Sequence, residues 1–505
     1  MSTRKSPRTA RRQRQAPPAP AYIKRVMPYY DAVDEETLEA LEDHVDWLIQ
    51  EVGLEFRENP AALERWKAAG ADVNGTRVRA PRGMIRALCK TAPSEFTQVA
   101  RNPARSVVIG GDNQVFVPVY GPPFVRDLEK GRRYGAIEDF NNLVKLVSQL
   151  PSLHHSGLVV CEPCDVPVSH RHLDMVYAHM RYGDKPHLGA ITEKSRAEDS
   201  VAMARILHGD NVVDQHCVIM GNVNTNSPLM VDKVVTESIE VYCGNSQGIV
   251  VAPFILGGAM GPVTTAGSLA QAFAEAMMCC AYSQLVKPGA PFVLGNFLSS
   301  MSLKSGAPTF GMPEPVLSNL IIGQLSRRLG VPLRCGGSLT ASKIADAQAA
   351  AESADSMFST MLGGANFVLH AAGWLEGGLC TGFEKLIIDA DRLGSYQKIL
   401  HQGLDVSPNA LAKQAYDDVE PAGHFLGSAH TMGNYETAYY EAQMSDSESF
   451  ESWEESGAKD TATRAFERWQ QMLRDYEAPA IDPAVDEALL DYIARRKQAL
   501  PEAWY

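Results

Sequence analysis

Short runs of apolar residues recur through the middle of the chain, and stretches with a helical pattern of apolar positions separate them. Residues 137–150 and 265–286 are two such helical stretches. Apolar runs of about four to eight residues without alternation are typical of strands buried on both faces, as in parallel sheets. The sequence therefore predicts seven strands, at SGLVV (156–160), HLGAI (187–191), CVIMGNV (217–223), GIVVAPFIL (248–256), PFVLGNF (291–297), VPLRCGG (331–337) and NFVLHAAG (366–373).

The alternation of strand and helix predicts an α/β fold. Eight such units close into a (β/α)8 barrel, the TIM barrel, and this is the architecture that we expect. The eighth strand is expected near residues 115–119 or around residues 385–388. An open, doubly wound parallel sheet is the alternative that the same alternation allows.

The two ends of the chain have different patterns. Residues 31–56 predict a helix that starts after the cap-like Asp34, and short β-like pieces follow from residue 72 to 135. A last helix begins at Asp482, with acidic residues early and basic residues late, as the helix dipole favours. We therefore expect four parts: a disordered basic tail (1–20), an N-terminal helix and β-rich extension (21–135), a TIM-barrel catalytic domain (136–400), and a C-terminal extension (401–505) with an acidic segment and a terminal helix.

The charge of the chain argues against a nucleic acid as its main partner. The net charge is −13, and residues 1–20 carry six basic and no acidic side chains, so the rest has −13 minus 6, or −19. An acidic body repels a phosphate backbone. The Pro- and Arg-rich tail is typical of a disordered terminus, although an RNA-binding tail or a transit peptide has a similar composition. Residues 435–456, with seven acidic residues and no basic one, are either the border of a docking surface or a solvated face.

Membrane spans, disulfides and metal sites are not expected either. No run of eighteen apolar residues is present, and the first residues lack the apolar core of a secretory signal. Nine cysteines without a disulfide pattern indicate a reducing cytoplasm. Cys161 and Cys164 have the spacing of half a zinc site, but no second pair follows, and the imidazole-rich segments 154–155 and 170–172 lack further ligands.

The ends of the predicted strands are rich in glycine, amide and aromatic groups and poor in acid–base pairs. A barrel enzyme carries its chemistry at these carboxyl ends. No GxSxG, GxGxxG or phosphate-loop motif is present, so the sequence assigns no catalytic acid, base or nucleophile. The composition favours a wide, smooth pocket that a large group can approach. The ends are Gly221-Asn222-Val223-Asn224, Pro253-Phe254, Gly295-Asn296-Phe297, Gly336-Gly337-Ser338 and His370-Ala371-Ala372-Gly373-Trp374.

Several long motifs occur in an order that resembles a known family. They are PFILGGAMGPVTTAGSLAQAFAEAM (253–277), SLKSGAPTFGMPEP (302–315), GGSLTASKIADAQAAAESA (336–354), GANFVLHAAGWLEGGLCTGFEKLIIDADRLG (364–394), AGHFLGSAHT (422–431) and IDPAVDEALLDYIARRK (481–497). With these motifs the chain resembles the trimethylamine methyltransferase superfamily over roughly residues 30–500. The resemblance implies a TIM barrel that moves a methyl group from nitrogen to the Co(I) of a corrinoid carried by a separate small protein.

The resemblance also implies a substrate class. The trimethylamine enzymes contain pyrrolysine at a position that falls near Ser342–Asp346, and the alignment places it at Ile344. This chain has ordinary residues there, which points to the non-pyrrolysine branch, whose members use glycine betaine and related quaternary amines. A quaternary ammonium leaves as a neutral amine, so its demethylation needs no acid. The missing acid–base pair agrees with such a substrate.

The chemistry of a quaternary ammonium suggests which side chains bind it. Aromatic faces attract the cation, a carboxylate balances its charge, and a donor binds the carboxylate of a betaine. The candidates are Trp374, Phe383, Phe310 and Phe297 for the cation, Glu376 or Glu384 for the counter-charge, and His370, Asn222, Asn296 or Arg334 for the carboxylate. Gly336, Gly337 and Ser338 are expected to face the corrinoid.

Other functions remain open from the sequence. The chain is a methyltransferase for trimethylamine or another methylamine without pyrrolysine, a Schiff-base barrel lyase that uses Lys343, or a non-catalytic binder of betaine-like solutes. The expected partners are a corrinoid protein and a small quaternary amine, with a homo-oligomer possible and with no nucleic acid or membrane.

Overall fold

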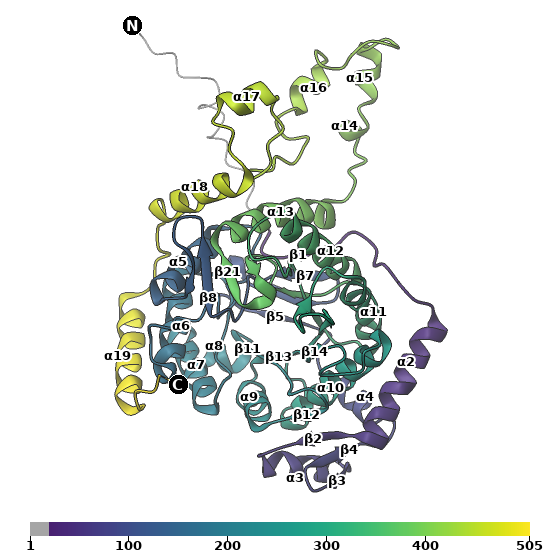
Figure 1. Ribbon diagram of the computed structural model, residues 1–505, viewed down its shortest axis with the longest axis vertical. Helices are drawn as coiled ribbons and strands as arrows, with labels where there is room; N and C mark the ends of the chain where they lie inside the picture. The colour runs from purple at the N-terminus through teal and green to yellow at the C-terminus, as the bar shows by residue number, and fades with distance from the viewer. Residues whose placement is uncertain (1–19, 505) are drawn as a thin grey trace.

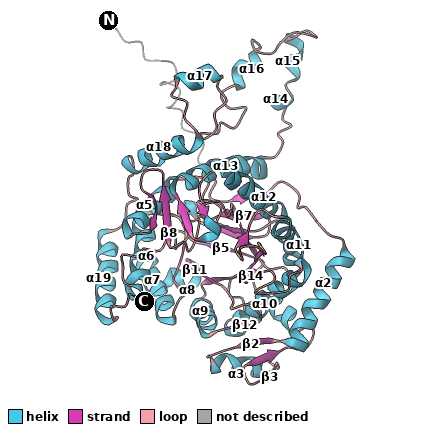
Figure 2. Ribbon diagram, viewed as in Figure 1, coloured by secondary structure: helices cyan, strands magenta, loops and turns pink. Residues whose placement is uncertain are grey.

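The computed structural model describes residues 20–504, so all but one residue of the expected basic tail lies outside the described residues. A ring of helices surrounds a central sheet, and segments from both ends of the chain extend beyond this ring (Figure 1). The strands of the central sheet lie inside the ring and the helices outside it, whereas β2 and β3 lie beyond the ring (Figure 2). The chain therefore has the predicted mixed α/β architecture.

The central sheet curls, and six of its parallel strands come from the predicted apolar runs. Seven of its ten strands run parallel. In order across the sheet they are β10 (His187–Leu188), β11 (Ile219–Val223), β13 (Gly248–Val251), β15 (Phe292–Gly295), β18 (Leu333–Gly336), β19 (Phe367–Leu369) and β7 (Asn113–Phe116). The antiparallel strands β6 (Val107–Gly110), β5 (Glu95–Gln98) and β1 (Ile23–Lys24) extend the sheet beyond β7.

Helices connect the parallel strands and cover the outside of the sheet. Helix α10 is buried along most of its length, because it is apolar on all sides. The helices are α5 (Ile137–Gln149), α6 (Val168–Tyr182), α7 (Lys194–His208) with α8 (Asp210–Gln215), α9 (Lys233–Gly244), α10 (Thr265–Val286), α11 (Pro313–Leu329), α12 (Ala347–Gly363) and α13 (Phe383–Gln402).

Two expectations about strands need correction. Residues 385–388 lie in α13, and the further parallel strand is β7, which overlaps the alternative range 115–119. The run 156–160 forms no regular strand, because the left-handed backbone of Gly157 (φ 73°) interrupts it. Residues 154–157 still connect β10 and β7, the first and last of the seven parallel strands, through backbone hydrogen bonds. His154 N–H donates to Phe116 O at 2.9 Å, and Leu188 N–H donates to Gly157 O at 2.9 Å.

Buried imidazoles hold this bridging segment in place. His154 Nδ1 accepts from Phe116 N–H at 3.0 Å. His179 contacts Ser156 Oγ through Nδ1 at 2.6 Å and Leu158 O through Nε2 at 2.7 Å. A carbonyl only accepts, so His179 Nε2 carries the proton and Ser156 donates to Nδ1. These neutral rings replace the regular backbone ladder of a strand.

The buried imidazoles predict a loss of stability in mild acid. Burial lowers the pKa of His154 and His179 to about 3 and that of His187 to about 4. In the unfolded chain a His takes up a proton near pH 6.5. The unfolded state therefore binds more protons below that pH, and the free energy of unfolding falls as pH drops from about 6.5 toward 4. Thermal melts by circular dichroism at pH 7.5, 6.0 and 5.0 should show a falling Tm, and an unchanged Tm across this range would refute the role of these rings.

The N-terminal extension begins with the predicted helix. Helix α2 (Glu35–Trp47) starts where the Asp34 carboxylate accepts from Thr37 N–H at 3.0 Å, and a π-helical turn (Leu48–Val52) follows it. Gly53, with φ of 70°, ends the turn. Next come the sheet β12 (Met230–Val231), β2 (Leu54–Phe56), β4 (Arg77–Arg79) and β3 (Asp72–Asn74), with helices α3 (Pro60–Ala68) and α4 (Met84–Cys89).

The C-terminal extension returns to the helices around the central sheet. Helix α18 (Thr461–Arg474) packs along α13, and α19 (Pro483–Ala499) packs against α6 and α7. The buried Asp199 carboxylate of α7 accepts from Tyr492 Oη at 2.7 Å and from Arg496 Nε at 2.6 Å. The segment before α18 projects away from the ring (Figure 1). It holds four short helices, α14 (Pro408–Leu411), α15 (Lys413–Asp418), α16 (Ala429–Asn434) and α17 (Phe450–Glu455).

Two small sheets follow the carboxyl ends of the parallel strands. One is β14 (Phe254–Leu256), β16 (Phe297–Met301) and β17 (Pro308–Thr309), and the other is β20 (Trp374–Leu375), β21 (Cys380–Gly382), β8 (Phe124–Asp127) and β9 (Gly131–Tyr134). They place the residues after β13, β15, β19 and β7 on one side of the central sheet. Between residues 20 and 504, no helix is both long and apolar enough to cross a membrane.

Candidate active site

Four rings from different strand ends meet at this side of the sheet. Phe297 follows β15, His370 follows β19, Trp374 begins β20, and Phe310 lies before α11. The ring centroids of His370 and Trp374 are 4.3 Å apart, and those of Phe310 and Trp374 are 5.8 Å apart. Phe297 lies 5.4 Å from His370 and 6.0 Å from Trp374. The sequence predicted all four as binding residues, and the structure brings them together. We call them the aromatic cluster.

The backbone at His370 is strained in a way that positions its ring. Its φ is 61°, a left-handed conformation that non-glycine residues seldom adopt. Tyr120 N–H donates to His370 Nδ1 at 3.2 Å. Burial, and then the charge of Arg334, lower the pKa of His370 well below its ordinary value, so the ring is neutral. The proton of the neutral ring is therefore on Nε2, which serves as a donor.

Arg334 brings a positive charge to the aromatic cluster. Its guanidinium carbon lies 4.8 Å from the centroid of Phe297, and Nη1 donates to Asn296 O at 3.0 Å. The side chain is 1% exposed, and in the described part of the chain no carboxylate forms an ion pair with it. Burial lowers its pKa to about 10, which leaves it charged at neutral pH. A buried guanidinium without a counter-charge is costly, and a bound anion would relieve that cost.

Three buried polar atoms at the cluster have no hydrogen-bond partner among residues 20–504. They are Asn296 Oδ1, Arg334 Nε and Trp374 Nε1. Asn222 Oδ1, on β11, is also buried without a partner in this part of the chain. Buried polar groups are nearly always paired, so the three atoms at the cluster indicate a polar ligand.

The other predicted binding residues have partners elsewhere. Glu376 lies two residues beyond Trp374, but its carboxylate pairs with Arg132 Nε at 2.9 Å. Phe383 packs against Trp469 of α18 at 5.0 Å, outside the cluster. Glu384 accepts from Trp469 Nε1 at 2.9 Å, and burial raises the pKa of this carboxyl. The structure therefore does not bring Phe383 or Glu384 to the cluster.

The stretch from Gly336 to Ser338 is buried against the segment after β19. A Cβ atom on Gly337 would lie 2.6 Å from Ala371 Cα, so only glycine allows this approach. Ser338 Oγ donates to Ala371 O at 2.7 Å. These three residues fix the segment that carries His370, and their buried positions leave little surface for the corrinoid contact expected of them.

The loop that carries Ile344 is pinned beside the cluster. The Glu352 carboxylate accepts from Thr340 Oγ1 at 2.6 Å and from Ala341 N–H at 2.8 Å. On the other side, Glu376 N–H donates to Ser342 O at 2.8 Å. Ile344 is 44% exposed on this loop. The expected pyrrolysine position thus lies on a fixed loop that contacts the segment directly after Trp374.

Lys343 does not have the surroundings of a Schiff-base lysine. It is exposed, and its Nζ donates to the carbonyl of Ala341 at 2.8 Å. Amines that form Schiff bases are usually activated by desolvation or by a second cation. The structure therefore does not favour the lyase reading.

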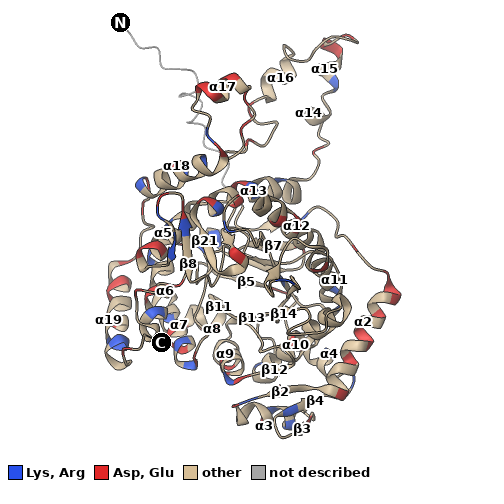
Figure 3. Cartoon of the chain, in the orientation of Figure 1, with Lys and Arg blue, Asp and Glu red and all other residues tan. Residues whose placement is uncertain are grey.

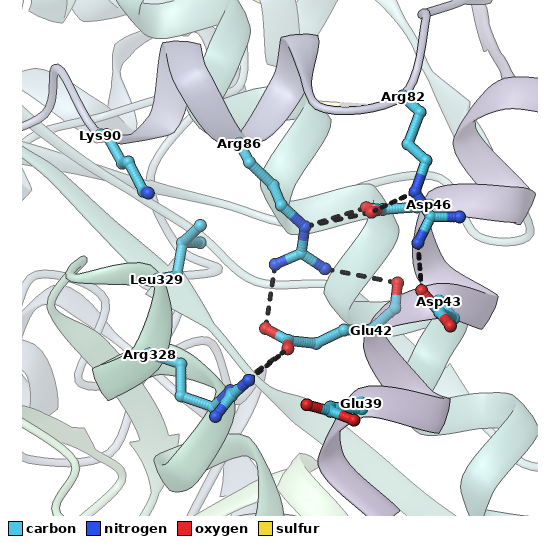
Figure 4. Close-up of a pocket in the computed structure, with 9 residues that line it drawn as sticks. All are labelled: Glu39, Glu42, Asp43, Asp46, Arg82, Arg86, Lys90, Arg328 and Leu329. Carbon is cyan, nitrogen blue, oxygen red and sulfur yellow. Dashed lines mark hydrogen bonds and ion pairs between the residues drawn. The ribbon is translucent and has the colours of Figure 1, made fainter. Parts of the chain in front are cut away.

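A pocket of about 600 Å³ lies away from the cluster, between α2, α4 and α11. Figure 4 shows that charged side chains line it and pair across it. Arg86 donates to Glu42 and to Asp46, each at 3.0 Å, and Arg328 donates to Glu42 at 2.9 Å. Because opposite charges satisfy each other, we assign this pocket to the attachment of α2 to α4 and α11. Over residues 20–504, no three potential metal ligands are grouped as a metal site requires.

Comparison with known proteins identifies a family and several relatives. Residues 1–501 match the model of a family described as trimethylamine methyltransferase (MTTB). A glycine betaine methyltransferase of Desulfitobacterium hafniense (strain Y51) is 36% identical over 480 residues, which cover 94% of this chain and 99% of the relative. A trimethylamine methyltransferase of D. hafniense (strain DSM 10664 / DCB-2) is 26% identical over 452 residues, 88% of this chain and 89% of the relative. A proline betaine:corrinoid methyltransferase of Eubacterium limosum is 24% identical over 416 residues, 81% of this chain and 84% of the relative.

Proposed function

The chain belongs to the trimethylamine methyltransferase (MTTB) family, and we propose that it demethylates a quaternary amine that bears a carboxylate, glycine betaine first. The methyl group goes to the Co(I) corrinoid of a separate partner protein. Two of the similar proteins carry a betaine in their names, and one of these names a corrinoid acceptor. The single observation that carries the choice of substrate is Arg334, a buried cation beside aromatic rings that pairs with no carboxylate of residues 20–504.

A zwitterion fits both halves of this site. The faces of Phe297, Phe310 and Trp374 attract the trimethylammonium group, because the ring quadrupole is negative above each face. The carboxylate binds the free Arg334 Nε and the Nε2–H of His370, which gives short, charge-assisted hydrogen bonds. Trimethylamine has no carboxylate and would leave Arg334 uncompensated. This difference favours a betaine over trimethylamine.

The chain's own residues bind, orient and exclude water, and none needs to move a proton. The corrinoid, when bound by its partner, supplies Co(I) as the nucleophile. The electron pair of the broken C–N bond stays on nitrogen, so glycine betaine leaves as neutral-nitrogen dimethylglycine. A neutral His370 suits this reaction, because an imidazolium would repel the substrate cation. Fixing both ends of the substrate aims one methyl group outward, and such positioning lowers the barrier.

We also infer that the curled sheet is a complete (β/α)8 barrel. The parallel strands number seven, and the segment 154–158 bridges β7 and β10 by backbone hydrogen bonds. With that segment counted as the eighth member, each unit is followed by one of the helices from α5 to α13. This arrangement supports the barrel that the sequence predicts and puts the aromatic cluster at its carboxyl end.

The test of the function is methylation of a Co(I) corrinoid protein. Glycine betaine should change the cobalamin absorption spectrum to that of methyl-Co(III) only when the enzyme is present. Trimethylamine, tetramethylammonium and dimethylglycine serve as alternative donors in parallel reactions. Rapid transfer from trimethylamine and none from any betaine would contradict the proposal. Tight binding of betaine without transfer to any corrinoid protein would favour a solute-binding protein instead.

A matched pair of variants tests the aromatic cluster. Trp374→Leu should raise the KM for glycine betaine about tenfold, since one desolvated cation–π contact contributes on the order of 1–2 kcal/mol. Phe383→Leu, a change at an equally buried ring that packs on Trp469, should leave KM within about twofold. Steady-state kinetics with the corrinoid assay measures both. Equal effects of the two changes would show that Trp374 acts through packing alone.

A further inference from the structure

Residues 404–439, which we call the arm, are almost all exposed or partly exposed. They run out from the end of α13 and back, away from the ring of helices (Figure 1). Only Ala415 and Ser428 within the arm are buried. Its two halves contact each other through Asn409 Nδ2, which donates to Asn434 Oδ1 at 2.8 Å. Such a segment lacks a core of its own and cannot repay its ordering entropy alone.

The side chains that the arm exposes are those of an interface. Leu404 is 88% exposed and Leu426 is 78% exposed. Residues 421–435 contain no Asp, Glu, Lys or Arg, although the whole chain is 21% charged. The centres of protein interfaces are depleted of charge in the same way. In Figure 3, α14 and α16 accordingly lack the red and blue that mark other exposed helices. The other large apolar side chains exposed on the arm are Val406, Leu411, Tyr416, Phe425, Met432, Tyr435 and Tyr439.

A second exposed apolar surface lies on the body of the same chain. Phe358 of α12 packs on Tyr396 of α13 at 5.7 Å, and Ile399 lies one helical turn further along α13. Val26 N–H donates to Leu400 O at 2.8 Å, which places Val26 beside that turn. Val26, Phe358 and Ile399 are each more than 40% exposed. We call these three residues the α13 face.

We propose that the arm covers the α13 face of a second copy of this chain. The arm of the second copy in turn covers the α13 face of the first copy. The arm points away from its own body (Figure 1), and most of its large apolar side chains are left exposed by their own chain. Two copies related by a twofold axis present both surfaces to each other, which is the isologous arrangement of most dimers. Residues 421–435 of the arm carry no formal charge, whereas residues 404–420 and 436–439 together carry five acidic residues and one basic residue. Because each copy has a net charge of −13, we expect two copies to meet through this uncharged segment.

The experiment is sedimentation velocity on the full chain at about 1–20 μM. A stable dimer stays associated over this range of concentrations. The wild type should sediment as a dimer of 55.0 kDa subunits, and Leu426→Asp should sediment as a monomer. The matched control is Leu303→Asp, a change at a residue that is 83% exposed outside the arm, and it should stay dimeric. We expect Leu426→Asp to weaken dimerisation at least about 100-fold, because the carboxylate would be desolvated in the interface. Circular dichroism should show the same secondary structure in all three.

A crosslink identifies the covered surface. A photoreactive phenylalanine at Leu426 should crosslink two copies, and peptide mapping should place the link in α12 or α13. A monomeric wild type, a dimer that survives Leu426→Asp, or links that map elsewhere would each overturn the proposal. Links to an added corrinoid protein in place of a second copy would also overturn it and would reassign the arm to that partner. None of these outcomes depends on methyl transfer, so they are independent of the proposed function.

Discussion

Arg334→Met is expected to lower kcat/KM for glycine betaine by about 10–100-fold while raising the melting temperature of the ligand-free protein. A hydrogen bond to a charged group contributes about 1.5–3 kcal/mol, and the loss of the one bond from Arg334 Nε gives this range. The opposite effect on stability follows because the change removes a buried charge that no carboxylate in the described chain balances. The corrinoid methylation assay and a thermal melt measure the two effects.

The substrate itself provides the control for this variant. Tetramethylammonium has the same cation but no carboxylate, so its transfer rate should change much less than that of glycine betaine. Arg334→Lys should recover part of the activity with betaine, because an ammonium supplies the charge but not the planar fork. If both substrates lost activity equally, or if the variant melted at a lower temperature, Arg334 would be a structural residue and the carboxylate site would have to be sought elsewhere.

Lys385→Met is expected to destabilise the fold by about 3–5 kcal/mol, the cost of leaving a buried charge without its partner. Lys385 Nζ lies 2.5 and 2.6 Å from the two carboxylate oxygens of Asp389, and both side chains are buried. Burial raises the pKa of the Asp389 carboxyl, and Lys385 opposes that rise. The same carboxylate accepts from Gly373 N–H at 2.9 Å, directly before Trp374. The variant should therefore also raise KM for the substrate.

A double variant separates the effect of the unpaired Asp389 charge on stability from the effect of the Asp389–Gly373 hydrogen bond on KM. Lys385→Met/Asp389→Leu removes both charges and should regain most of the melting temperature, but it lacks the acceptor for Gly373 and should keep the raised KM. Lys398→Met, on the same helix at a half-exposed position, should change neither quantity. Denaturant unfolding and steady-state kinetics measure the set. Recovery of KM together with stability would show that the ion pair does not position the segment before Trp374.

The sequence predicts the sheet and part of the cluster for a local reason. Phe297, His370 and Trp374 follow apolar runs directly, and the carboxyl ends of parallel strands meet on one side of a sheet. Arg334 could be noticed because it interrupts the otherwise apolar run VPLRCGG. Its lack of a counter-charge could not be seen, since that depends on every neighbour in space.

The sequence did not predict where some of the candidate side chains lie, because their positions are set by partners far away along the chain. Phe383 and Glu384 begin α13, and the face they present is set by Trp469, which lies 85 residues from Glu384. Glu376 has its charge neutralised by Arg132, 244 residues away. The Lys385 and Asp389 pair has the i,i+4 spacing of an ordinary surface ion pair, and only the packing of α13 makes it a buried one.

The pairing of β7 with β19 sets an order for the synthesis of the chain. Asn366 Nδ2 donates to Asn113 O, 253 residues earlier, where the two strands meet. At about 5–20 residues per second, a ribosome needs roughly 13–50 s between these positions. During that time the strand that holds Val115 and Phe116, fully buried in the finished protein, lacks its neighbour. The nascent chain therefore carries an open apolar edge, which is the kind of surface that chaperones protect and that aggregates when synthesis outpaces them.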